Sequence, residues 1–180
     1  MKKIILTYGL ISGIIVSGIM LVSMNYLSHC KGNMDYNTSM VVGYAAMLLA
    51  FSLVLVGVKQ YRDKSNAGVI SFGMAFRIGI FIVLIASTLY VLAWLVNYYF
   101  FMPDFIERYS AHMLEDMKAE GASASEIQKE AQEMASFAKM YRNPFFNALI
   151  TYLEILPMGL IVTLISAFIL KRRVQESLNP

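Results

Sequence analysis

Four long runs of apolar residues, separated by polar segments, dominate the chain. They cover about 4–27, 40–58, 78–102 and 145–170, and only the fourth contains a charged residue, Glu154. A transmembrane helix needs about 20 consecutive, mostly apolar residues. The pattern therefore predicts four membrane-spanning helices.

The segment between the third and fourth runs, 104–142, has the periodicity of amphipathic helices. One apolar stripe recurs at intervals of three and four residues, at Ile106, Tyr109, Met113 and Met117. A second stripe follows, at Ile127, Ala131, Met134, Ala138 and Tyr141. Between the stripes, Gly121 interrupts the pattern, and Ser123 and Glu126 have the spacing of a capping box. We therefore predict two antiparallel helices joined near Gly121.

Two interpretations of this helical hairpin are open. In the first, the two helices pack on each other and their charged side chains are simply solvated. In the second, the hairpin is a docking surface for a partner protein or a second copy. Methionine suits an adaptable interface, but the chain has 13 methionines in all, so their presence in the stripes decides little.

Basic residues are distributed unequally between the two ends of the predicted spans. One side of the membrane would hold Lys2, Lys3, Lys59, Arg62, Lys64, Arg77, Lys171, Arg172 and Arg173. The other side would hold Lys31 and the long connection 103–144, in which acidic residues outnumber basic ones. The positive-inside rule then predicts cytoplasmic termini, a cytoplasmic 59–77 loop and an extracytoplasmic hairpin.

Composition supports a membrane protein. Hydrophobic residues make up 58% of the 180 residues and charged residues 15%, against roughly 25% charged in an ordinary soluble domain. The net charge of +3 is too small to indicate nucleic-acid binding. The single cysteine excludes an intrachain disulfide, and His29 with Cys30 supplies too few ligands for a zinc site.

Glu154 is the most informative polar position, because a carboxylate within a span usually faces the bundle interior or water. Asn25, Asn97 and Tyr98 lie at matching depth, so the sequence predicts a small polar cluster with Glu154. Pro157 removes a helical hydrogen bond and predicts a kink nearby. The cluster is either a site for a proton, ion or substrate, or a structural pin between helices.

Two of the runs carry small residues at every fourth position. These are Gly9, Gly13 and Ser17 in the first run and Gly159, Thr163 and Ala167 in the fourth. Small residues at this spacing let membrane helices approach closely. They favour assembly of the bundle or a homo-oligomer, and they indicate no chemistry.

Motifs of catalysis are absent. The sequence has no phosphate-binding glycine loop, no nucleophile elbow and no zinc-protease helix motif. We therefore expect no enzyme activity, no catalytic residue, no cofactor and no bound metal ion.

The segment Tyr61, Arg62 and Asp63 follows the second span at the predicted cytoplasmic face. Cations suit the end of a helix, where the backbone dipole is negative. Arg62 and Lys64 can also contact anionic lipid headgroups, and Asp63 can pair with Arg62 or Arg77. The alternative is a solvated tight connection with no further role.

Three parts of the chain together resemble a known family. They read KQYRDK at 59–64 with GVISFGMAF at 68–76, MPDFIERY at 102–109, and TYLEILPMG at 151–159 leading into LISAFIL at 164–170. In this order and spacing the chain resembles the bacterial membrane-protein family known as domain of unknown function 4199 (DUF4199). The resemblance implies four membrane helices with a long connection between the third and fourth. It implies no activity, and no catalytic residue can be carried over.

We therefore expect an all-α protein, with one integral membrane domain over 1–180 in the bacterial inner membrane. It would be a four-helix transmembrane bundle with an extracytoplasmic helical hairpin between spans three and four. The favoured function is a non-enzymatic structural or accessory role, through helix packing and the hairpin. Its partners would be the lipid bilayer and either a second copy or another membrane protein. The alternative is a small transporter or channel that uses Glu154.

Overall fold

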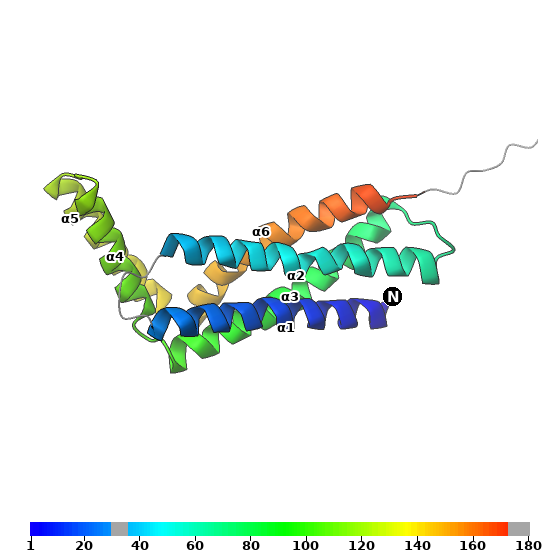
Figure 1. Cartoon of the computed structure of the whole chain (residues 1–180), viewed down its shortest axis with the longest axis horizontal. Coiled ribbons are helices and arrows are strands. Elements are labelled where there is room, and N and C mark those ends of the chain that lie inside the picture. The colour runs from blue at the N-terminus through cyan, green and yellow to red at the C-terminus, as the bar shows by residue number, and fades with distance from the viewer. Residues whose placement is uncertain (30–35, 173–180) are drawn as a thin grey trace, which may run out of the picture. The chain divides into compact units, whose positions relative to one another are not determined.

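The computed structural model is all-helical over the residues that it describes. These are the backbone of 1–29 and 36–172 and, within them, the side chains outside 25–39. This part of the chain contains six helices, which are labelled in Figure 1: α1 (Lys2–His29), α2 (Tyr36–Ser65), α3 (Phe72–Phe100), α4 (Phe105–Ala119), α5 (Ala124–Tyr141) and α6 (Pro144–Leu170). Four of them, α1, α2, α3 and α6, are long and apolar enough to cross a membrane. The predicted all-α class with four spans and a helical hairpin is confirmed.

The membrane helices extend beyond the apolar runs that predict them. α2 continues past Val58 to Ser65, and α3 begins at Phe72 rather than near Ile78. Charged residues end an apolar run, but they do not end a helix. The last turn of α2 carries Arg62 and Lys64, whose positive charges interact favourably with the helix dipole.

The chain forms two compact units, which we describe separately. The first unit comprises Met1–Val91 and Tyr152–Pro180, and the second comprises Leu92–Thr151. α3 and α6 each contribute residues to both units. The expectation of one integral membrane domain over 1–180 stays a prediction.

Close helix approach at small residues builds the first unit. α1 meets α3 where Gly13 faces Leu89, and a Cβ added at Gly13 would lie 2.6 Å from the Leu89 Cδ1. α6 meets its neighbours at Gly159, where an added Cβ would overlap Val83 and lie 3.2 Å from the Phe51 Cζ. Lipid tails are as apolar as leucine, so membrane helices associate through packing, and small residues permit that packing. The two predicted small-residue faces are therefore used inside the unit.

A tight turn and a backbone bridge follow α2 in the same unit. Ala67 and Gly68 have φ angles of +50° and +78°, in the left-handed region that glycine adopts without strain. Ile70 then forms an antiparallel bridge with Arg172 through two backbone hydrogen bonds of 2.9 Å. The α2–α3 loop is thereby joined to the residues that follow α6.

α4 and α5 form a helical hairpin in the second unit. Gly121, with φ of +83°, lies in the turn between them. The Ser123 Oγ accepts a hydrogen bond of 3.3 Å from the backbone N–H of Glu126, and the Glu126 Oε2 accepts one of 2.8 Å from the backbone N–H of Ser123. The predicted capping box is confirmed. Ile106 and Tyr141 are buried, and the other members of the two apolar stripes are half-buried.

Candidate functional site

Glu154 lies inside the apolar part of α6, about 15 Å along the helix from Pro144 at 1.5 Å per residue. The buried side of this helix is a stripe at intervals of four, formed by Asn147, Thr151, Ile155, Gly159 and Thr163. Glu154 is not on that side, because its side chain is exposed. Ile161, two turns further on the same face, is 52% exposed. The carboxylate therefore lies on an apolar outer face of the first unit.

Within the first unit, no described residue satisfies this carboxylate. No described backbone or side-chain donor of the unit hydrogen-bonds to Glu154, and no described cation of the unit forms an ion pair with it. A carboxylate in hydrocarbon is costly unless it is paired or meets water. The described part of the first unit therefore leaves the Glu154 carboxylate without a partner.

Pro157 lies one turn after Glu154, and the helix continues past it to Leu170. Proline has no N–H, so the carbonyl of Leu153 has no helical donor. The helix beside Glu154 therefore lacks one backbone hydrogen bond. Asn25 lies in α1, and its side chain is outside the described ones, so its place in the polar cluster stays a prediction.

Asn97 and Tyr98 lie near the end of α3 and belong to the second unit. Their side chains are only 7% and 2% exposed. The Asn97 Nδ2 and the Tyr98 hydroxyl have no hydrogen-bond partner in the described part of the chain. The Tyr98 ring packs edge-on against Tyr141, with 5.3 Å between ring centroids. Glu154 belongs to the first unit, and the predicted cluster that joins it to Asn97 and Tyr98 stays a prediction.

A buried indole organises the polar interior of the second unit. The Trp94 Nε1 donates to both the Tyr141 hydroxyl and the Asn147 Oδ1, each at 3.0 Å. The Thr151 hydroxyl donates to the Asn147 carbonyl at 2.9 Å. These bonds join α3, α5 and α6. The sequence gives little indication of this network, because Trp94 lies about 50 positions before both of its acceptors. Only Asn147 and Thr151 have the spacing of neighbours on one helix face.

An ion pair closes the base of the hairpin. The Arg142 Nη2 lies 2.8 Å from the Glu107 Oε1, and the Tyr99 hydroxyl donates to the Arg142 carbonyl at 2.9 Å. The hydrogen bond and the charge of Glu107 raise the pKa of Arg142. The residue after α5 is thereby fixed to the first turn of α4. No short-range pattern in the sequence predicts the Glu107–Arg142 pair, because its members are 35 positions apart.

The segment Tyr61, Arg62 and Asp63 forms the last turns of α2. The Arg62 Nε lies 2.6 Å from the Asp63 Oδ1, so Asp63 pairs with Arg62, the first of the two partners considered. The Arg62 Nη1 also donates to the carbonyl of Leu170 at 3.5 Å. Tyr61 is half-buried. This segment therefore contacts the end of α6.

The described residues contain no group of three or more His, Cys, Asp or Glu side chains that could hold a metal ion. The side chains of His29 and Cys30 lie outside the described ones. An open hollow of about 440 Å³ lies at the hairpin turn, and its charged lining is Glu120, Glu126, Lys129 and Glu130. No serine, cysteine or histidine is among the residues that line this hollow.

Comparisons with known proteins agree with the architecture. The model of a family described as "Protein of unknown function (DUF4199)" matches residues 7–172, which include nearly all of the four candidate spans and the whole hairpin. No curated protein and no solved structure matches the chain. The match confirms the resemblance seen in the sequence and shows an uncharacterised, multi-pass membrane protein. The chain therefore belongs to the DUF4199 family.

Proposed function

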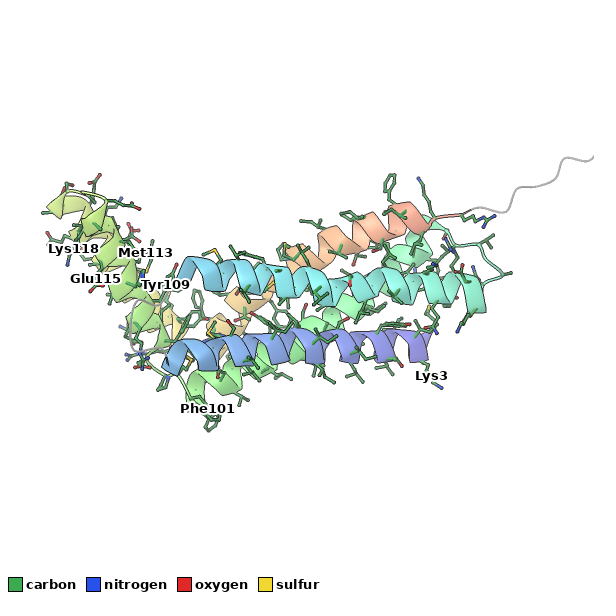
Figure 2. The ribbon with its side chains drawn as sticks, in the orientation of Figure 1. Lys3, Phe101, Tyr109, Met113, Glu115 and Lys118 are labelled. Atoms are coloured by element: carbon green, nitrogen blue, oxygen red, sulfur yellow. The ribbon has the colours of Figure 1, made fainter. Side chains whose placement is uncertain are left out.

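We propose that this chain is a non-enzymatic accessory protein of the membrane, which binds another membrane protein through the α4–α5 hairpin. The strongest support is that the apolar stripes of the hairpin remain half-exposed. Met113, Met117 and Met134 are each half-exposed along the stripes. Figure 2 shows Tyr109 and Met113 of one stripe on α4, a helix that also carries Glu115 and Lys118.

The hairpin is ordered before any partner binds. The capping box at Ser123 holds the start of α5, and the Glu107–Arg142 ion pair holds the base. Binding by a preorganised element loses less conformational entropy than binding by a flexible loop. Methionine side chains adapt to the shape of a partner. A stiff hairpin with adaptable apolar stripes is suited to recognising a protein surface.

The first unit would serve as the membrane anchor in this proposal. We place the termini and the α2–α3 loop in the cytoplasm, and the hairpin outside the cytoplasm, in a bacterial inner membrane. The support is the basic residues at the ends of α2 and α6, among them Lys59, Arg62, Lys171 and Arg172.

A small transporter or channel is the second candidate, because Glu154 is a carboxylate within a span and no described residue of its own unit pairs with it. Because Glu154 is exposed, a transport site at this residue requires a further surface to enclose it. In this candidate we infer that a second copy covers that face of α6, because no described residue of the first unit covers it. The two candidates therefore differ in the partner that they require.

The test is purification of the tagged full chain from its native membrane in mild detergent, followed by native mass measurement and identification of bound proteins. Met113→Glu with Met134→Glu places charges on the stripes. The matched control is Ala111→Glu with Ala135→Glu, at exposed positions of the same two helices. We expect one stoichiometric partner with the wild type and the control, and its loss with the stripe variant.

Glu154→Gln separates the two candidates. The accessory proposal expects this variant to keep the partner. A homo-oligomer without a foreign protein, combined with a proton flux in vesicles that Glu154→Gln abolishes, would contradict the accessory proposal and establish the transporter. Circular dichroism and a monodisperse elution profile check that each variant is folded.

A further inference from the structure

Basic side chains gather at one end of the first unit, which we call the basic end and define by Lys59, Arg62, Lys171 and Arg172. Figure 1 shows the end of α2, the α2–α3 loop and the end of α6 together at this end of the unit. The Ile70–Arg172 bridge and the bond from Arg62 to the α6 terminus hold these distant segments side by side. The cluster is therefore built by specific contacts.

Positive charge at the basic end is largely uncompensated. Asp63 pairs with Arg62, and Lys59 and Arg172 lie close enough to influence the same carboxylate electrostatically. The four positive charges of the cluster and the one negative charge of Asp63 leave a net +3. None of Lys59, Lys171 and Arg172 forms an ion pair with a described carboxylate. An anionic partner would find cations available there.

Lys171, one of the four cations of the basic end, contacts an exposed aromatic ring. The Lys171 Nζ lies 4.2 Å from the centre of the Phe168 ring, which is 63% exposed. Phe168 packs edge-on against Phe72, with 5.6 Å between centroids. Lysine side chains at helix ends extend along apolar surface and keep the ammonium group among the lipid headgroups. Since the apolar run of α6 ends at Leu170, we expect the cations to lie near the lipid phosphates in either orientation of the protein.

We propose that the basic end binds the phosphate of an anionic phospholipid, with Lys59 and Arg172 as its principal contacts. A guanidinium matches two phosphate oxygens, and an ammonium adds a point charge. The bridge to Ile70 already fixes the backbone of Arg172, so ordering this backbone costs little further conformational entropy on binding. A zwitterionic lipid neutralises its own phosphate, whereas an anionic lipid offers a net negative charge that complements the cluster. This inference concerns the first unit and does not depend on the role proposed for the hairpin.

The experiment titrates phosphatidylglycerol, and separately phosphatidylcholine, into delipidated full-length protein in a non-ionic detergent, with bound lipid counted by native mass spectrometry. The variant is Lys59→Gln with Arg172→Gln. The matched control is Lys118→Gln with Lys139→Gln, which removes the same charge from exposed positions of the hairpin. We expect phosphatidylglycerol to bind the variant about 30-fold more weakly than the wild type, since each cation near lipid contributes about 1 kcal/mol. The control should keep the wild-type affinity.

Three results would overturn the proposal. They are equal affinity for the two lipids, equal phosphatidylglycerol binding by the variant and the control, and displacement of the lipid by inorganic phosphate, which would identify a soluble phosphate as the ligand. If the double variant does not fold, Lys59→Gln alone should weaken binding about fivefold. The exchange Lys59→Arg with Arg172→Lys preserves charge but moves the guanidinium group, so it should bind phosphatidylglycerol more tightly than Lys59→Gln with Arg172→Gln and more weakly than the wild type. Binding no tighter than that of the glutamine double variant would also contradict the proposal.

Discussion

The two units of the chain are held together by different interactions. In the first, helices meet at Gly13 and Gly159. The side-chain hydrogen bonds between its helices include, among the described residues, those from Ser12 to the Ala50 carbonyl and between Thr88 and Tyr152. In the second, the main stabilising interactions are the Trp94 network, the capping box and the Glu107–Arg142 ion pair. Close packing is the main interaction in the first unit. Directed polar bonds are the main interaction in the second unit, where the Trp94 network joins two candidate spans to the end of α5. Added volume should therefore damage the first unit most, and a lost donor the second.

The largest effect is expected for Gly159→Ala. Its methyl group would overlap Val83 and crowd Phe51. Overpacking of this kind costs about 3 kcal/mol of unfolding free energy. Thermal unfolding in detergent micelles, followed by circular dichroism, measures the loss.

Gly18→Ala is the matched control, because a Cβ at Gly18 meets nothing within 4 Å. It should leave stability unchanged or raise it slightly through better helix propensity. Val83→Ala should partly rescue Gly159→Ala by removing the overlapping methyl groups. Equal stability of the two glycine variants would show that close packing at Gly159 does not stabilise the first unit.

Trp94→Phe should have the next largest effect, and in the second unit. It keeps an aromatic ring but removes the indole N–H that donates to the Tyr141 hydroxyl and to the Asn147 Oδ1. Two lost hydrogen bonds of about 1 kcal/mol each give a loss of about 2 kcal/mol. Tyr99→Phe is the control, since its bond to the Arg142 carbonyl is exposed, and it should cost clearly less. Equal losses would contradict a special role for the buried network.

Ser123→Ala should have the smallest of these effects. It removes the cap of α5 and should cost the hairpin about 1 kcal/mol. Faster amide exchange in the first turn of α5, measured by mass spectrometry, would report this loss. Ser136→Ala is the control, because the Ser136 hydroxyl bonds only to the Gln132 carbonyl within the exposed part of the same helix.

The stability of the first turn of α5 should also depend on pH, because the capping box contains a carboxylate. The hydroxyl and backbone N–H of Ser123 lower the pKa of Glu126 below its ordinary value of 4.5. A carboxyl whose pKa is lower in the folded state stabilises that state above its unfolded pKa, and this contribution is lost as the pH falls through the folded value. Protection of the first turn of α5, corrected for intrinsic exchange, should therefore fall in acid. Glu126→Gln should remove the pH dependence, and an identical acid response in both proteins would count against the capping box.

Local features of the fold were predictable from the sequence, because local forces create them. The four spans follow from apolar length, and the hairpin follows from its stripes, Gly121 and the capping box. The Trp94 network and the Ile70–Arg172 bridge join positions far apart in the chain, so no short pattern encodes them.

The outward position of Glu154 could have been predicted from helix geometry. Five residues separate it from Gly159, which corresponds to about 140° around an α-helix, so it could not share the small-residue face.

The bridge between Ile70 and Arg172 has a consequence for biosynthesis. Ile70 leaves the ribosome before α3, whereas Arg172 follows α6, so the bridge cannot close until α6 has been translated and inserted. Until then the backbone groups of Ile70 remain available to water. The basic end is thus completed only after α6 has been inserted, and a nascent chain that stops before α6 lacks both the bridge and the cations that follow that helix.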